Sequence, residues 1–352
     1  MSFMFNKGLN IAIIGCGAIV EQQHLPGLAQ RDDCRVVALV DQNEARAARL
    51  AKRFEVSTVF TDYRHLLSLD IAAAFVALPN HLHAPVTIEL LKAGIHVLVE
   101  KPMALSVAEC DAMLEAAEAG QTVLAVGLMR RFSQAGQFAK WVIESGLLGQ
   151  IISFDIQNGF VYDWSVKTDF FLRKEMAGGG VLMDLGVHAL DQLLWWLGDV
   201  ESFTCYDDSY GGVEADCQLR LTFKSGAQGM AEFSRTRNLR ETAIIRGERA
   251  ELEVSLVQNL ATLRFLDSGM SLTGHTTLPG EPILPDQRVA DLIAAEHKDF
   301  LEAIKTGRPV TVPGAEGKRS VALIEACYAE RRPLKLPWVE VQAPSTIKER
   351  SL

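Results

Sequence analysis

An acid and a base directly follow a short run that reads as a buried strand. Residues 97–99 are Val-Leu-Val, and Glu100, Lys101 and Pro102 come next. In an open parallel sheet the carboxyl ends of the strands line the ligand crevice, so a lysine there can face a bound cofactor and its substrate. A surface ion pair that ends an ordinary strand would give the same three residues. The motif therefore indicates a catalytic edge only if other elements supply the rest of a site.

A second candidate site follows three consecutive glycines, Gly178 to Gly180. Asp184 and His188 are four residues apart in the helix that this run is expected to open, so their side chains would share one face. A histidine suits proton transfer near neutral pH, and a neighbouring carboxylate, here Asp191, would orient its ring and raise its pKa. The alternative is structural, with Asp184 complementing the helix dipole and His188 packed in the core.

A glycine turn near the N-terminus could bind a nucleotide. Gly15 and Gly17 follow an apolar run and precede a helical stretch, the setting in which backbone approaches a pyrophosphate. Val20 stands where the fingerprint has glycine or alanine, so the turn alone is a weak signal. Asp41 ends the second expected strand, where a carboxylate can bind both ribose hydroxyls and repel a 2′-phosphate, which favours NAD over NADP. Asp41 could instead cap the next helix, and methyltransferases use a similar turn and acid.

Several histidines lie near the same expected sheet edge. His81 and His83 are two residues apart on a turn, where Asn80 is expected to cap the following helix. Neither this pair nor Asp184 and His188 has the further His or Cys ligands that a zinc site needs, so no metal is predicted. His24, after the glycine turn, suits a ligand role and a packing role equally.

Length and composition exclude several classes of protein. The 352 residues, 48% of them hydrophobic, predict two domains. The net charge is −9 and the basic residues are scattered, so we expect no nucleic-acid surface. The six cysteines have no metal-binding spacing, which predicts reduced, buried thiols and a cytoplasmic protein. The first ten residues do not resemble a secretory signal, and no uncharged apolar run approaches the ~20 residues that span a bilayer.

The first 127 residues alternate between apolar runs and alanine-rich helical stretches, which predicts a doubly wound α/β domain. Strands are expected at residues 11–15, 36–41, 57–60, 71–78, 97–100 and 123–127, and helices at residues 44–54, 85–93 and 107–119. Residues 130–147 are expected to form one amphipathic helix that leads out of this domain. Such strands are continuously apolar because both faces of a parallel sheet are covered.

The remaining residues, 128–352, predict an α+β domain with a large, mainly antiparallel open sheet. Residues 215–223 alternate strictly between apolar and polar, which marks a strand with one buried face. Further strands are expected at residues 151–157, 229–234, 242–246 and 251–257, and helices at residues 289–306 and 316–330.

Taken in order, these motifs resemble the glucose-fructose oxidoreductase, inositol dehydrogenase and MocA-like family of NAD(P)-dependent oxidoreductases. The resemblance covers nearly the whole chain. Four motifs carry it: the glycine turn with His24-Leu25-Pro26 downstream, the segment from Pro79 to Pro85, Glu100-Lys101-Pro102, and the glycine run that leads to His188. It implies an N-terminal Rossmann domain at residues 1–127 and a substrate-binding domain at residues 128–352, whose sheet makes dimer or tetramer contacts.

The resemblance also implies roles for individual residues. Lys101 would lie near the nicotinamide and the reacting oxygen, while Asp184 and His188 would supply acid–base chemistry. Glu100 and Asn80 would help to hold the nicotinamide ribose. The implied cofactor contacts are Gly15, Gly17, Ala18, Ile19, Asp41, Pro79, Asn80, His83, Glu100 and Lys101. The implied substrate contacts are Arg130, Arg131, Tyr162, Trp164, Lys167, Arg173, Asp184 and His188.

The expected reaction is reversible hydride transfer between NAD and a ring hydroxyl of a sugar, cyclitol or sugar derivative. His188 would accept the hydroxyl proton, and Lys101 would polarise the oxygen. The basic residues near the cleft are compatible with a phosphorylated, nucleotide-linked or carboxylated sugar, and equally with simple surface charge. Two alternatives remain at this point: a reductase of imines or other carbonyl-type bonds, and a catalytically silent NAD-binding sensor or scaffold.

Overall fold

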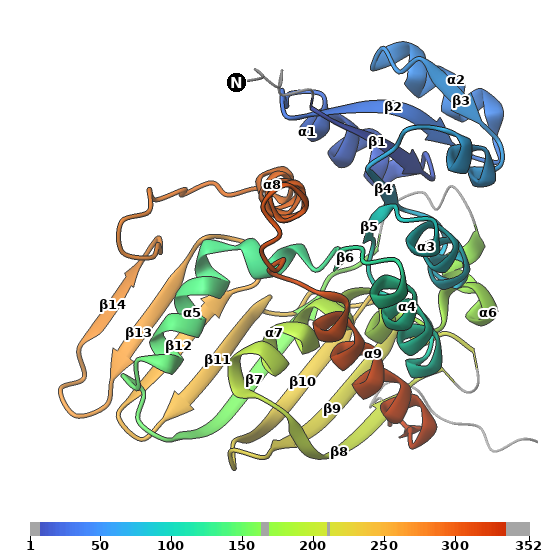
Figure 1. The fold of residues 1–352 in the computed structure, drawn as a ribbon. Helices are drawn as coiled ribbons and strands as arrows, with labels where there is room; N and C mark the ends of the chain where they lie inside the picture. The colour runs from blue at the N-terminus through green and yellow to red at the C-terminus, as the bar shows by residue number, and fades with distance from the viewer. Residues whose placement is uncertain (1–7, 163–168, 210–211, 336–352) are drawn as a thin grey trace, which may run out of the picture.

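The N-terminal domain is built on a six-stranded parallel sheet (Figure 1). The computed structural model describes residues 8–162, 169–209 and 212–335. Ile11 and Ile13 point into one apolar core, whereas Ala12 and Ile14 point into another, so the strand that carries them is buried on both faces as predicted. The strand order is β3-β2-β1-β4-β5-β6. The strands are β1 (Leu9–Ile14), β2 (Cys34–Val40), β3 (Thr58–Phe60), β4 (Ala73–Val76), β5 (His96–Val99) and β6 (Leu124–Val126).

Helices connect these strands, and short polar side chains cap two of the α-helices. Asn43 accepts a hydrogen bond from the backbone of Arg46 at the start of α2, and Ser106 does the same for Glu109 at the start of α4. The helix after the glycine turn is π-helical in its middle. The helical elements are η1 (Val20–His24), α1 (Leu25–Leu28), α2 (Glu44–Arg53), η2 (Tyr63–Ser68), η3 (Asn80–Leu82), α3 (His83–Lys92) and α4 (Val107–Ala119).

The second domain contains a nine-stranded, mainly antiparallel sheet, with helices α5, α7 and α9 against one face (Figure 1). Two pairs are parallel, β7 with β10 and β8 with β15. The order is β14-β13-β12-β11-β7-β10-β9-β8-β15. The strands are β7 (Ile151–Gly159), β8 (Val200–Asp207), β9 (Asp216–Phe223), β10 (Gln228–Ser234), β11 (Thr242–Gly247), β12 (Ala250–Ser255), β13 (Ala261–Phe265), β14 (Ser271–Gly274) and β15 (Arg332–Pro333).

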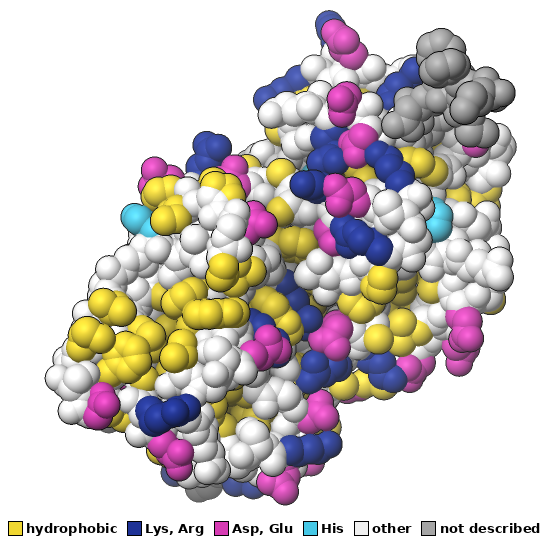
Figure 2. Space-filling view, turned by 60° about the vertical axis from the view of Figure 1, so that its left-hand side comes forward, with side chains coloured by type: hydrophobic (Ala, Val, Ile, Leu, Met, Phe, Trp, Pro, Cys, Tyr) yellow, Lys and Arg dark blue, Asp and Glu magenta, His cyan; other side chains and the backbone are white. Residues whose placement is uncertain are grey.

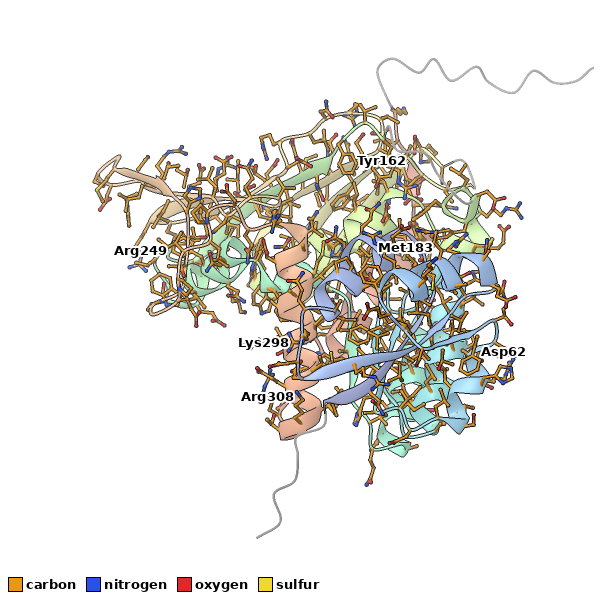
Figure 3. The ribbon with its side chains drawn as sticks, turned by 90° about the horizontal axis from the view of Figure 1, so that it is seen from above. Asp62, Tyr162, Met183, Arg249, Lys298 and Arg308 are labelled. Carbon is orange, nitrogen blue, oxygen red and sulfur yellow. The ribbon has the colours of Figure 1, made fainter. Side chains whose placement is uncertain are left out.

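Two late helices, α8 (Val289–Thr306) and α9 (Gly314–Ala329), return to the N-terminal domain. Phe300 of α8 packs in the same core as Ile11 and against the Phe75 ring of β4. The backbone of Val126 in β6 donates to the carbonyl of Val312, just before α9, at 3.1 Å. Figure 3 shows α8 alongside the first strands. The C-terminal part of the chain therefore covers one face of the parallel sheet and holds the two domains together.

One predicted helix is wrong. Residues 130–147 do not form a continuous helix but a short 3₁₀ segment, η4 (Met129–Phe132), followed by α5 (Gln134–Glu144). Ser133 has extended backbone angles and accepts a hydrogen bond from the backbone of Gly136 at 3.0 Å, so it caps α5 and interrupts the helix. The break turns Arg130 and Arg131 into the interior, where both are buried.

The helix after the glycine run also begins differently from its prediction. A π-helical turn, η6 (Leu182–Gly186), precedes the regular helix α7 (Val187–Leu197), and two shorter helices, η5 (Asp169–Leu172) and α6 (Lys174–Ala177), come before it. Within the described ranges, no helix is long and apolar enough to cross a membrane. The six cysteines are unpaired and buried, as predicted.

Candidate active site

Asp184 lies at the centre of a cluster of donors from three parts of the chain. Lys101 Nζ donates to Asp184 Oδ1 at 2.7 Å and to its backbone carbonyl at 3.1 Å. Oδ2 accepts the hydroxyl of Tyr162 at 2.8 Å and a terminal nitrogen of Arg235 at 3.0 Å. Burial opposes ionisation of Asp184, but the charges of Lys101 and Arg235 outweigh it and lower the pKa of the carboxyl. An ionised Asp184 therefore fixes the lysine at the sheet edge.

The glycine run lets the chain pass close to Glu214 and Tyr328, and so places Asp184. Side chains at Gly179 and Gly180 would fill the space that these two residues occupy. A Cβ on Gly180 would lie 1.9 Å from the backbone carbonyl oxygen of Glu214, and one on Gly179 would lie 1.9 Å from the hydroxyl of Tyr328. The carboxylate of Glu214 accepts hydrogen bonds from the backbone of Gly180 and Leu182, both at 2.9 Å. Tyr328 donates to the same carboxylate at 2.7 Å. Glu214 thus holds the start of η6, and Met183 of this element lies where the two domains meet (Figure 3).

Asn80 and His83 tie the end of β4 to the rest of the site. The prediction that Asn80 caps α3 is wrong. Its amide instead donates to the carbonyl of Ala177 at 2.9 Å, just before the glycine run. The ring of His83 is fully buried and contacts two carbonyl oxygens, those of Pro102 at 2.7 Å and Leu78 at 2.8 Å. His83 therefore links the β4 turn to the segment that carries Lys101.

His188 lies beside this cluster in an uncharged form. Its side chain is buried, and its Nδ1 has no hydrogen-bond partner within the described part of the chain. Burial lowers the pKa of His188 well below its usual value, and the positive charges of Lys101 and Arg130 lower it further against the opposing effect of Asp184. The direction is opposite to the one predicted. A neutral imidazole beside a fixed lysine can accept a proton from a bound hydroxyl.

Asp191 does not orient His188, because it belongs to a different cluster. Arg131 donates two hydrogen bonds to the carboxylate of Asp191, at 2.9 and 2.7 Å, and a third to Glu316 at 2.8 Å. Arg131 is buried, and its guanidinium also lies over the ring of Trp195. Both carboxylates are thus paired with Arg131, which joins α7 to α9.

Glu100 faces a chain of histidines below the site. Its Oε1 contacts His24 Nε2 at 2.9 Å, and His24 Nδ1 contacts His297 Nε2 of α8 at 2.8 Å. Its Oε2 accepts the backbone N–H of Lys101 at 3.1 Å. Burial opposes ionisation of Glu100, but the hydrogen bond and charge of His24, together with Lys101, lower its pKa. His24 is therefore a positioning residue for the Glu100-Lys101 edge.

The remaining predicted substrate contacts separate into two groups. Arg130 is buried next to the cluster and donates to the side chain of Asn158 at 3.0 Å. Arg173 lies outside the cluster, where its exposed guanidinium pairs with Asp169. Trp164 and Lys167 lie outside the described residues.

The glycine turn has the shape that a dinucleotide requires. Gly15 has φ +97°, and a Cβ there would lie 2.1 Å from the carbonyl oxygen of Ala77, so only glycine fits. A Cβ on Gly17 would meet no atom within 4 Å, which leaves open space beside the turn. Asp41 accepts hydrogen bonds from the backbone of Cys16 and of Asn43, both at 2.8 Å. A carboxylate has about four acceptor positions, so two remain for ribose hydroxyls.

These residues fit a bound NAD. Gly15, Gly17, Ala18 and Ile19 would receive the pyrophosphate at the turn, and Asp41 would hold the adenosine ribose. Asp41 does not cap the next helix, because Asn43 does so. Pro79, Asn80, Glu100 and Lys101 lie at the same edge of the sheet, where the nicotinamide end would reach, and His83 supports them from below.

Comparison with known proteins agrees with this arrangement. A family model described as an oxidoreductase family with an NAD-binding Rossmann fold matches residues 9–128, and the GFO/IDH/MocA C-terminal domain model matches residues 137–253. The chain belongs to the GFO/IDH/MocA family. Its N-terminal domain is therefore an NAD-binding Rossmann domain, and the protein is an oxidoreductase.

Two relatives align over almost the whole chain. Levoglucosan dehydrogenase of Pseudarthrobacter phenanthrenivorans is 27% identical, with 95% of this chain and 98% of the relative covered. Myo-inositol 2-dehydrogenase of Thermotoga maritima is 26% identical, with 93% and 98% covered. A solved structure of levoglucosan dehydrogenase in complex with NADH and levoglucosan has a TM-score of 0.82 at 24% identity, with 92% of this chain and 98% of that chain covered. The last comparison shows a shared fold.

Sequence reasoning missed Arg235, Glu214 and His297. Arg235 directly follows β10, and an arginine after a strand has no distinctive local signal. Glu214 precedes β9, 34 residues from the glycine that it binds. His297 and His24 are 273 residues apart. Each of these contacts depends on chain segments that only the folded structure brings together.

Proposed function

We propose that this protein catalyses reversible hydride transfer between the nicotinamide of NAD and a ring hydroxyl or ketone of a sugar, cyclitol or sugar derivative. The observation that carries the proposal is the Lys101–Asp184 pair, 2.7 Å apart, at the carboxyl end of β5 beside a neutral His188. The names of the relatives support the substrate class, because they include dehydrogenases of an anhydrosugar and of a cyclitol.

Bound NAD supplies the hydride acceptor at C4 of its nicotinamide. In the oxidation direction, Lys101 donates a hydrogen bond to the reacting oxygen and stabilises the negative charge that develops on it. His188 accepts the hydroxyl proton, and returns it when the reaction runs backwards. Asp184 orients Lys101, and Tyr162 and Arg235 hold Asp184 in turn.

Cofactor preference would depend on Asp41. Its carboxylate repels a 2′-phosphate, so we expect NADH to bind more tightly than NADPH. Arg46 Nη1 lies 3.5 Å from Asp41 Oδ2 and would be free to meet a 2′-phosphate once the acid is removed. Asp41→Ala should therefore weaken NADH binding and improve NADPH binding in a fluorescence titration. Equal affinities of the unchanged protein for the two cofactors would contradict this role.

We further propose a cytoplasmic homodimer or homotetramer that associates through the open face of the large sheet. The cytoplasmic assignment rests on six unpaired, buried cysteines. Association is supported by the exposed apolar side chain of Met230 of β10, which alternates with the buried Ala231 and therefore faces away from the helices. Figure 2 shows hydrophobic side chains gathered at the lower left of that view, among intermingled acidic and basic residues. Size-exclusion chromatography with light scattering tests this part.

The reaction itself is tested by NADH formation with a panel of cyclitols, free sugars and nucleotide sugars. Lys101→Ala and His188→Ala are run beside the unchanged protein, each with an NADH titration and a melting curve. We expect turnover of at least one ring alcohol, and loss of turnover with retained NADH binding in both variants.

Three results would argue against the proposal. Turnover of imines but of no ring alcohol would favour a carbonyl-type reductase. NADH binding without turnover of any substrate would favour a silent sensor or scaffold. Unchanged activity in both variants would remove the mechanism assigned to Lys101 and His188.

A further inference from the structure

Two adjacent arginines, Arg130 and Arg131, are both buried but differ in their partners. Arg131 forms ion pairs with Asp191 and Glu316. Arg130 forms no ion pair with any residue that the structure describes, and its only side-chain partner is the neutral oxygen of Asn158. Its Nη1 is buried without a hydrogen-bond partner among the residues that the structure describes. Both guanidinium groups are therefore buried, but only that of Arg131 is paired with carboxylates among the described residues.

The titration of the two arginines reflects this difference. Burial lowers the pKa of Arg130 to about 10, against weaker opposing effects of Glu241 and Asp184, neither of which contacts it. Burial also acts on Arg131, but its hydrogen bonds and ion pairs with Asp191 and Glu316 outweigh it, so the pKa of Arg131 is raised. Even with its lowered pKa, Arg130 stays protonated at neutral pH.

Further polar atoms without partners lie in the same site. Among the described residues, the Nδ2 of Asn158, the Nε of Arg235 and the Nδ1 of His188 are each buried without a partner, and Arg235 joins the site through Asp184. Asn158 contacts Arg130 directly, and His188 lies close enough for the charge of Arg130 to affect its titration. Native proteins leave few buried polar groups unpaired, and a group of them needs an explanation such as a missing ligand.

Among the described residues, no carboxylate pairs with Arg130. Lys101, Arg130 and Arg235 each carry a positive charge, and Asp184 is the one carboxylate that contacts a side-chain nitrogen of any of them in the described part of the chain. Glu100 pairs with His24 instead. Asp184 bonds to Lys101 and Arg235 and leaves Arg130 uncompensated. A neutral sugar hydroxyl could occupy one donor but would not balance the charge, whereas a carboxylate can accept two parallel N–H groups from one guanidinium.

We propose that the substrate is a carboxylated sugar, such as a uronic acid, whose carboxylate binds to Arg130 and Asn158 while its ring hydroxyl reacts at Lys101 and His188. The inference rests on the proposed function and specifies its substrate class. Arg130 and Asn158 become specificity-determining residues, and the hydride transfer itself is unchanged. The small carboxylate suits a guanidinium that is only 8% exposed.

The test compares substrates that differ in charge but little in shape. NADH formation is measured with D-glucuronate and with its uncharged amide, D-glucuronamide. Galacturonate is compared with galactose in the same way, and glucose 6-phosphate serves as a sugar with a different anionic group. We expect kcat/KM to favour the uronates by roughly 10- to 100-fold, as for a charge-assisted hydrogen bond. Arg130→Gln should abolish this preference through KM, Arg130→Lys should retain part of it, and the exposed control Arg35→Gln should keep all of it.

A second measurement does not depend on turnover or on the variants. The melting temperature of the NADH-bound unchanged protein should rise with glucuronate more than with glucuronamide. If uronates shift the melting temperature but no ring alcohol is oxidised, the carboxylate subsite stands and the proposed reaction fails. If neutral sugars turn over as well as uronates, the reaction stands and the carboxylate inference fails. A preference for the sugar phosphate, or no shift and no turnover with any uronate, would also overturn the inference.

Discussion

Two buried clusters of charge flank α7, and they differ in how completely their charges are matched. In the first, Arg131 is enclosed by Asp191 and Glu316, so every charged group has a partner. In the second, Asp184 pairs with the side chains of Lys101 and Arg235, and no carboxylate among the described residues pairs with Arg130. A cluster with all its partners inside the chain can only stabilise the fold. A cluster with unsatisfied cations and donors needs a ligand to complete it, which is why we assign chemistry to the second.

The largest effect should come from Lys101→Ala, which removes the group that we propose stabilises charge on the reacting oxygen. We expect kcat to fall by roughly 10³-fold, the range seen when an electrostatic donor is removed. The free energy of unfolding should change by less than about 1 kcal/mol, because Lys101 is partly exposed and Asp184 keeps Tyr162 and Arg235. Steady-state kinetics and urea denaturation measure the two quantities. Lys92→Ala, at an exposed position, is the control.

In the cluster of Arg131, Asp191→Ala should reduce stability while leaving activity nearly unchanged. Removing one partner of a buried ion pair leaves Arg131 poorly compensated, so the free energy of unfolding should fall by about 3 kcal/mol. Activity per folded molecule should stay within a few-fold of the unchanged protein, because no atom of this cluster contacts the reacting groups. Asp32→Ala, at an exposed position, should change neither quantity. A large loss of kcat in Asp191→Ala without a loss of stability would reverse the assignment of the two clusters.

The pH dependence of kcat/KM tests the state of His188 in the second cluster. The pKa of His188 is lowered by burial and by the charges of Lys101 and Arg130, so the ring stays a base below pH 6.5. We expect kcat/KM for oxidation to stay level as the pH falls through 6.5 and to decline only at lower pH. Arg130→Gln removes one positive charge, so the pKa of His188 and the acid limb should move upward. An acid limb that stays in place would mean that another group controls it.

Protonation of the histidines whose pKa values are lowered should also affect the stability of the fold. His188 and His297 both have folded-state pKa values well below those of the unfolded chain, so the unfolded chain binds more protons as the pH falls below about 6.5. The free energy of unfolding should therefore decrease from pH 7 towards pH 5. Urea denaturation across this range measures the slope, and His188→Gln should make it shallower.

The smallest effect is expected for Glu214→Gln, which tests how the glycine run is held. An amide has one acceptor oxygen, so either the Gly180 or the Leu182 backbone N–H loses its partner. We expect a loss of about 1–2 kcal/mol and faster hydrogen exchange at these two amides. The activity should fall only a few-fold, because Asp184 is also held by Lys101. Unchanged exchange would show that the glycine run does not depend on Glu214.

Local patterns were enough to predict the elements that build the two domains. The continuous apolar runs of β1, β4 and β5 predict a sheet covered on both faces, and the strict alternation in β9 predicts a strand with one polar face. The predicted ends of α8, residues 289 and 306, are the observed ones. The interruption at Ser133 was not predicted, because the hydrophobic period continues across it and only the capping hydrogen bond reveals it.

The sequence by itself determined the sheet edge, because strand patterns fix where each strand ends and therefore put Gly15, Asp41, Asn80 and Lys101 on the same side of one sheet. It also determined the family, because four motifs occur in a fixed order. Only the tertiary structure decided the partners. Arg130 and Arg131 are adjacent and chemically identical in the sequence, and contacts with residues 28 to 185 positions away leave one without an anion and enclose the other. Burial sets the state of His188 in the same way, because desolvation and nearby charge depend on packing that no local pattern encodes.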